Sequence, residues 1–241
     1  MNAPAIFPAK DSDLGVHSLA REMQAFAAAA LSPPSFPPDA PAGDGHAVLV
    51  IPGFLAGDWT TARLRDFLAH LGYCAETADI RFNTGPTRGL VNKLQSRLEA
   101  LHEDTGAAVS LVGISLGGTL ARQLARANPR RARAVVTLCS PIRFPVETPL
   151  QPFAQILAPL HEAEWMAHLE EIGDPLPLPV TAIYSEEDGI LDWRTCLQDA
   201  CADACNVRVA SAHTTIASHP AAQSAVAHAL ARGAAFISGK P

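Results

Sequence analysis

The chain has 241 residues and a formal net charge of −6, and 48% of its residues are hydrophobic. A chain of this length and composition can bury a sizeable core in one α/β domain without disulfides or a structural metal. The acidic balance, together with the lack of any run of lysines and arginines, argues against a nucleic-acid partner.

The first part of the chain differs from the rest. Residues 14–31 have the pattern of an amphipathic helix, and five prolines between residues 32 and 44 prevent that helix from continuing. We therefore expect an N-terminal helix with a proline-rich connector in residues 1–45 and the main domain in residues 46–241.

Strands and helices alternate beyond the connector. This alternation, with apolar strands, predicts an α/β fold with a mainly parallel sheet covered by helices on both faces. Ligand sites in such sheets lie at the carboxyl ends of the strands. The predicted strands cover residues 47–51, 73–78, 107–112, 134–138, 179–184 and 206–209, and the predicted helices cover residues 60–71, 90–105, 116–128 and 220–236.

The alternation breaks after Ser140. Residues 141–179 contain eight prolines, and two short helices are predicted between them at 153–160 and 162–172. We expect a cap insertion at about residues 141–178. Its apolar side chains suit an acyl chain and equally suit packing onto the domain, so both interpretations stay open. They are Phe144, Phe153, Ile156, Leu157, Leu160, Trp165, Met166 and Leu169.

A Gly-x-Ser-x-Gly motif, Gly113-Ile114-Ser115-Leu116-Gly117, lies between a predicted strand and a predicted helix. This is the layout of a nucleophile elbow, in which flanking glycines permit a turn too tight for side chains. The turn would lift the Ser115 hydroxyl out of the sheet, and the N-terminus of the following helix could stabilise an oxyanion. An incidental serine in a glycine-rich turn is the alternative.

A serine nucleophile needs a base and an acid, which on this architecture follow in the order acid and then histidine. The acid candidates after the strand 179–184 are Glu186, Glu187, Asp188 and Asp192. Asp188 precedes Gly189 in a turn just past the strand, which favours it as the acid. Asp192 could instead cap the helix that begins near Trp193.

His213 follows the last predicted strand by a few residues and precedes the final helix, which favours it as the base. His219 is the second candidate, although its place before Pro220 suits a residue at the start of a helix. His228 lies within that helix and suits surface or packing.

An oxyanion hole needs two backbone N–H groups. Leu116, directly after the serine, should supply one of them. The loop after the first strand, Pro52-Gly53-Phe54, should supply the other. Because proline has no N–H, Phe54 is the predicted donor, and an ordinary turn with a packed aromatic ring is the alternative.

These segments together resemble the α/β-hydrolase superfamily, and more narrowly small bacterial lipase- and esterase-like hydrolases. The resemblance rests on residues 50–54, 110–118, 183–190 and 212–213, which occur in the expected order. It implies Ser115 as nucleophile, Asp188 as acid and His213 as base, with Phe54 and Leu116 as oxyanion donors. The Thr-Thr-Ile sequence after His213 differs from the glycine-rich loops of relatives.

The resemblance implies a serine hydrolase that cleaves carboxylic esters, with a small ester or lipid-like molecule as its partner. An acyltransferase or thioesterase would use the same three residues. A non-catalytic binding module with this fold is the remaining alternative, although such proteins usually lack one residue of the triad. The sequence leaves the oligomeric state open.

Cysteine and histidine usage bears on compartment and cofactors. The five cysteines (74, 139, 196, 201 and 205) are odd in number and irregularly spaced, which favours reduced thiols in a cytoplasmic protein. The nine histidines form no compact ligand set, so we expect no metal and no cofactor. Residues 1–13 lack the pattern of a secretory signal, and residues 25–31 are too few to span a bilayer.

Overall fold

The computed structural model describes residues 14–34, 36–199 and 203–238. Its six strands form one sheet in the order β2-β1-β3-β4-β5-β6, and every pairing is parallel. The predicted parallel sheet is therefore confirmed. The strands are β1 (Ala47–Ile51), β2 (Cys74–Thr77), β3 (Val109–Ile114), β4 (Ala132–Leu138), β5 (Val180–Tyr184) and β6 (Ala204–Arg208).

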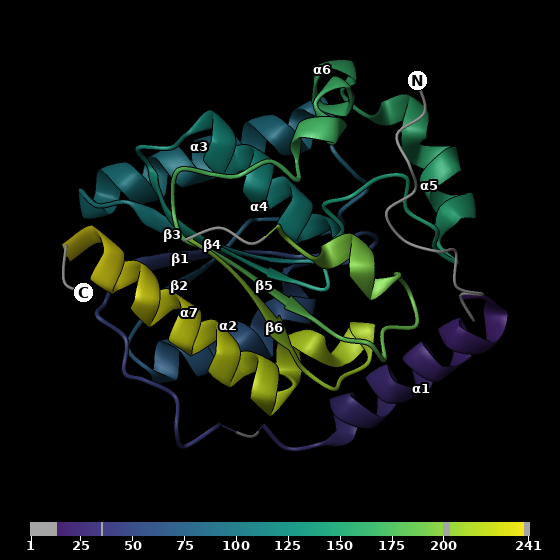
Figure 1. Ribbon diagram of the computed structural model, residues 1–241, viewed down its shortest axis with the longest axis horizontal. Helices are drawn as coiled ribbons and strands as arrows, with labels where there is room; N and C mark the ends of the chain where they lie inside the picture. The colour runs from purple at the N-terminus through teal and green to yellow at the C-terminus, as the bar shows by residue number, and fades with distance from the viewer. Residues whose placement is uncertain (1–13, 35, 200–202, 239–241) are drawn as a thin grey trace.

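Helices cover both faces of the sheet, as the alternation predicts (Figure 1). Helices α3 (Arg88–Thr105) and α4 (Leu116–Ala127) lie on one face. Helices α2 (Ala62–His70) and α7 (Pro220–Ser238) lie on the other. None of the helices in the described part of the chain is long and apolar enough to cross a membrane.

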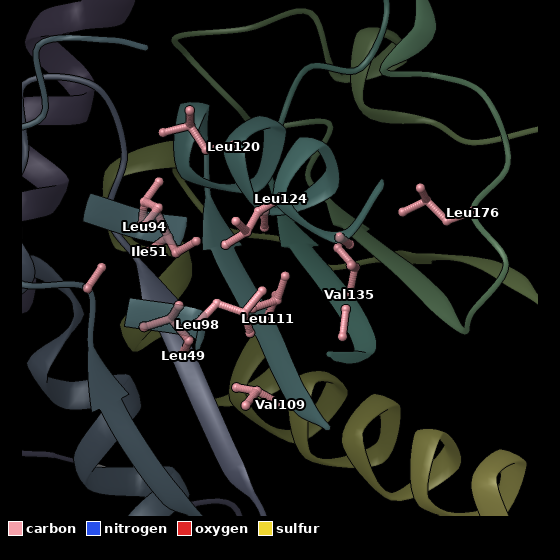
Figure 2. Packing of buried hydrophobic residues seen from close by; sticks show 14 of the residues in the cluster. Leu49, Ile51, Leu94, Leu98, Val109, Leu111, Leu120, Leu124, Val135 and Leu176 are labelled. Carbon is pink, nitrogen blue, oxygen red and sulfur yellow. The ribbon is translucent and has the colours of Figure 1, made fainter. Parts of the chain in front are cut away.

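The inner strands β1, β3, β4 and β5 contribute to two cores, because successive side chains point to opposite faces of the sheet. In β1, Leu49 and Ile51 pack with Leu94 and Leu98 of α3, a cluster that Figure 2 shows from close by. The alternate residues of β1 and β3 pack with α2 and α7 instead. Burial on both faces explains why these strands are almost wholly apolar.

The insertion folds as four short helical segments: α5 (Gln151–Leu157), η2 (Ala158–Leu160), α6 (Ala163–Ala167) and η3 (Leu169–Glu171). The single helix predicted over residues 162–172 is therefore wrong. His168 interrupts it, because its ring Nδ1 bonds the Glu164 carbonyl oxygen at 2.7 Å. In a continuous helix, that oxygen would accept the backbone N–H of His168.

The apolar side chains of the insertion divide between the two interpretations that the sequence leaves open. Trp165 is buried, and Leu169 packs against the same cluster. By contrast, Phe153, Ile156 and Leu160 are exposed to solvent. The second half of the insertion therefore packs onto the domain, whereas the first half presents an apolar surface.

The N-terminal helix α1 (Val16–Leu31) forms as predicted and ends before the proline-rich connector. It lies beside the segment η5 (His213–Ser218), which follows β6 (Figure 1). The expectation of no secretory signal concerns residues 1–13, which lie outside the described residues, as does Cys201. The other four cysteines are free thiols.

Candidate active site

Ser115 occupies a strained turn between β3 and α4. Its φ of 53° and ψ of −127° are rare for a residue with a side chain. A Cβ on Gly113 would lie 2.3 Å from the Gly117 carbonyl oxygen, and a Cβ on Gly117 would lie 2.3 Å from the Ile51 carbonyl oxygen. The backbone segments therefore approach so closely that only glycine fits on either side, as a nucleophile elbow requires.

Asp188 lies in the turn that follows β5, where both oxygens of its carboxylate are used. Oδ1 accepts hydrogen bonds from the N–H groups of Ile190 and Leu191, each at 2.8 Å, and Oδ2 lies 2.6 Å from Nδ1 of His213. The Asp188 side chain is only 1% exposed. The turn thus fixes the orientation of the carboxylate.

The other acid candidates do different work. Glu186 and Glu187 are exposed, and the Asp192 carboxylate accepts a hydrogen bond from the Arg194 N–H at 3.0 Å, which caps the short helix η4 (Trp193–Cys196). The prediction of a cap by Asp192 is therefore confirmed.

His213 begins η5, and its side chain is 10% exposed. Among the described residues, neither His219 nor His228 contacts a carboxylate. The structure therefore brings the predicted acid together with His213 and with no other candidate base.

The loop after β1 lies against the serine. A Cβ on Gly53 would lie 3.1 Å from the Ser115 Cβ. The Leu55 N–H donates to the Asn83 carbonyl oxygen at 2.8 Å, whereas the N–H groups of Gly53 and Phe54 have no acceptor within the described chain. The Leu116 N–H is likewise without an acceptor there. Free donors therefore exist at both predicted positions.

The three side chains follow the carboxyl ends of β3, β5 and β6, and the parallel pairing places these ends at one edge of the sheet. The Ser115 hydroxyl itself makes no hydrogen bond to a residue that the structure describes. Hydrogen bonds of this kind are often long before substrate binds.

This arrangement has counterparts among known proteins. A model of the alpha/beta hydrolase family matches residues 47–236. The chain belongs to this family. The match covers every strand and both of the segments that carry Ser115 and His213, and it begins after α1.

Solved structures of other alpha/beta hydrolases share the fold with low sequence identity. The lipolytic enzymes LipS and LipT, derived from a metagenome, give a TM-score of 0.56 at 16% identity, over 85% of this chain and 100% of theirs. The monoacylglycerol lipase of Paleococcus ferrophilus gives 0.55 at 14% identity, over 78% and 96%.

A thioesterase domain from the curacin biosynthetic pathway gives a TM-score of 0.54 at 15% identity, over 78% of this chain and 93% of that domain. At such identities the comparisons bear on the fold alone. Among curated protein sequences, none matches this chain.

The surroundings of His213 in this hydrolase favour its charged form. Burial lowers the pKa of the imidazole, but the charge and hydrogen bond of Asp188 and the charge of Glu22 outweigh burial and raise the pKa above 6.5. The thiol of Cys139 also faces the pair, and burial together with the Asp188 charge raises its pKa well above the ordinary value. Cys139 is therefore a neutral thiol beside Asp188.

Two of these neighbours, Glu22 and Cys139, are absent from the site that the sequence predicts. Cys139 directly follows the strand predicted at 134–138, so the sequence pattern could have placed it at the same edge of the sheet as the site. Glu22 lies on α1, and helical spacing puts it on the same face as Ser18. The sequence gives no signal for the groups that hydrogen-bond the Glu22 carboxylate.

A second serine–histidine–aspartate row lies at the opposite edge of the sheet. Nε2 of His46 lies 2.8 Å from the Ser110 hydroxyl, and Nδ1 bonds the Asp44 carboxylate. Burial lowers the pKa of His46, although Asp44 opposes this, so the ring is neutral near neutral pH. Ser110 is 0% exposed, within β3, and cannot meet a substrate.

We therefore expect Ser110→Ala to lower stability without loss of catalysis. The variant leaves the buried Nε2 of His46 without a donor, which costs about 1–3 kcal/mol in the free energy of unfolding. Urea denaturation measures this cost, and hydrolytic turnover per folded molecule should stay at the wild-type value. A loss of turnover in fully folded protein would contradict the structural role given to this row.

Proposed function

We propose that this alpha/beta hydrolase cleaves carboxylic esters through an acyl-enzyme on Ser115. One observation carries the proposal above the others. A buried Asp188–His213 hydrogen bond of 2.6 Å lies at the sheet edge where Ser115 occupies a strained elbow. Strain and a buried ionisable pair are costly, and both cluster at active sites.

In the proposed reaction, Nε2 of His213 accepts the Ser115 proton as the hydroxyl oxygen attacks the ester carbonyl. Asp188 holds Nδ1 protonated and stabilises the imidazolium that forms. The N–H groups of Leu116 and Phe54 stabilise the oxyanion, and His213 then gives its proton to the departing alcohol. A water molecule activated by His213 cleaves the acyl-enzyme.

The insertion supports an apolar substrate. Phe153, Ile156 and Leu160 are exposed on its first half, and exposed apolar groups gathered on one segment are typical of surfaces that meet a ligand. Two of the structural neighbours are described as lipolytic or as a lipase, which agrees with an ester of a fatty acid.

The proposal is tested with p-nitrophenyl esters of increasing acyl length and with a fluorophosphonate probe. Hydrolysis by the wild type, with the probe attached to Ser115, would support it, and the optimum acyl length would define the substrate class. Labelling of Ser115 with turnover of acyl thioesters alone would instead identify a thioesterase. Absence of both labelling and turnover would favour a binding module.

Activity should fall as the medium is acidified, because only the neutral imidazole of His213 can accept the serine proton. The pKa of His213 is raised above 6.5, so the acid limb of the kcat/KM profile should have its midpoint above that value. Measuring kcat/KM with a short p-nitrophenyl ester in buffers of constant ionic strength gives the profile. A midpoint below 6.5 would contradict the environment assigned to His213.

A cytoplasmic location stays a prediction from the sequence, as does the division into residues 1–45 and 46–241.

A further inference from the structure

The carboxylate of Glu22 is buried, and among the described residues its hydrogen bonds come from backbone N–H groups and one hydroxyl. It belongs to α1, and the residue is only 2% exposed. Oε1 accepts hydrogen bonds from the N–H groups of Gly189 at 2.8 Å and His213 at 2.9 Å. Oε2 accepts from the N–H of Thr214 at 2.9 Å, and the Thr214 hydroxyl lies 2.9 Å from both Oε2 and the main-chain carbonyl oxygen of Glu22. Burial of a carboxylate is costly unless donors of this kind surround it.

These donors belong to the two loops that carry the proposed acid and base. Gly189 directly follows Asp188, and the Glu22 carboxylate also bonds the backbone of His213 itself. One carboxylate group therefore joins the backbone of the acid loop to the backbone of the base loop. The join lies beside the 2.6 Å hydrogen bond between the two side chains.

Helix α1 docks on the domain through both polar and apolar groups. Its two buried residues, Ser18 and Glu22, are polar, whereas Val16 is 82% exposed. Leu19 is partly buried against a small apolar cluster, and the Phe26 ring meets the Trp59 ring edge-on with the centroids 6.1 Å apart. Apolar contacts therefore help to hold the helix, but the side chains that it buries most deeply are polar. Figure 1 shows α1 in purple beside the yellow segment that follows β6.

We propose that Glu22 is a positioning residue that holds the Asp188 and His213 loops in register for catalysis. The proposal rests on the ester-cleaving function proposed above. Glu22 contacts no reacting atom, and it acts through the backbone of the two loops. Its helix precedes residue 47, where the match to the family begins.

The charge of Glu22 adds a second, electrostatic effect. The ionisable groups that face the His213 imidazole are Asp188 from the β5 loop, Cys139 from the end of β4 and Glu22 from α1. Cys139 is a neutral thiol, so the two carboxylates supply the negative charge. Glu22 thereby favours the imidazolium that forms as Ser115 attacks.

Glu22→Gln tests the proposal with little change of volume. Glutamine turns one acceptor oxygen into an NH₂ group, which would face either the N–H groups of Gly189 and His213 or the N–H group of Thr214. We expect kcat to fall roughly 10- to 100-fold, as for a small misplacement of catalytic groups, with KM nearly unchanged. The acid limb of the pH profile should move to lower pH, because a negative charge near the imidazolium is lost. Glu103→Gln, at an exposed position of α3, is the matched control for charge.

Thr214 provides a second, milder variant. Thr214→Val keeps the branched shape and removes the hydroxyl that donates to Glu22, whereas Thr214→Ser keeps that donor. We expect kcat to fall in the valine variant and to stay near the wild-type value in the serine variant. Active sites are counted with a fluorophosphonate, so that kcat refers to folded molecules only.

The proposal is overturned if kcat per active site and the acid limb stay at wild-type values in Glu22→Gln while only the thermal midpoint falls. Equal kcat in the valine and serine variants would also overturn it. If Glu22→Gln does not fold, the Thr214 pair decides the outcome.

A readout without substrate separates this proposal from the proposed function. In ¹⁵N-labelled protein, the His213 Nδ1–H proton bonded to Asp188 gives a far-downfield resonance, assigned by its loss in His213→Gln. Glu22→Gln should weaken or shift this resonance and lower the pKa of the ring, whether or not wild type cleaves esters. An inactive wild type with these changes would refute ester cleavage alone, and an unchanged resonance and pKa would refute positioning by Glu22.

Discussion

Replacement of Ser115 by alanine is expected to lower kcat for ester hydrolysis by about 10⁶-fold, the loss seen when a serine nucleophile of this type is removed. The reason is that the proposed mechanism forms the acyl-enzyme on Ser115 alone. The residual rate would come from the oxyanion donors and from substrate binding alone. Steady-state hydrolysis of a p-nitrophenyl ester at high enzyme concentration measures the loss.

The variant should also lose all labelling by the fluorophosphonate. Ser110→Ala, in the second serine–histidine–aspartate row, is the matched control and should label as wild type does. Retention of more than a few per cent of the wild-type rate in Ser115→Ala would show that the chemistry lies elsewhere.

Asp188→Asn is expected to lower kcat by about 10⁴-fold. The amide oxygen can still accept the N–H bonds of Ile190 and Leu191, so the turn should keep its shape. The amide NH₂ would then face Nδ1 of His213 and force the proton onto Nε2. In that tautomer His213 cannot take the proton of Ser115.

Single-turnover and steady-state kinetics measure this loss, and thermal unfolding shows whether the fold is retained. Glu187→Gln is the control, because Glu187 is exposed one residue away and should leave kcat unchanged. A variant that folds and loses less than tenfold would contradict the role of Asp188 in fixing the tautomer.

The inner strands were readily predicted because a strand buried on both faces is continuously apolar. Ser115 and Asp188 could be proposed because each follows such a strand, and His213 because it follows the last strand, β6; the carboxyl ends of parallel strands meet at one edge. The choice of His213 over His219 used its distance from the last strand and the place of His219 before Pro220. That the three act together in catalysis stays a prediction.

The insertion and Glu22 were harder for a physical reason. The break at His168 depends on one ring nitrogen that captures a carbonyl oxygen, and periodicity does not report such a competition. The partners of Glu22 are backbone N–H groups, which every residue except proline carries. A side chain that binds backbone therefore leaves no residue type by which a partner can be identified.

The contacts of Glu22 also bear on the order in which the molecule is made. They join residues that are 167, 191 and 192 positions apart in the chain. Helix α1 is synthesised well before the loops that carry Asp188 and His213. Contacts so distant in sequence carry a large entropic cost of loop closure. We therefore expect α1 to dock only after both loops have formed, as one of the later steps of folding.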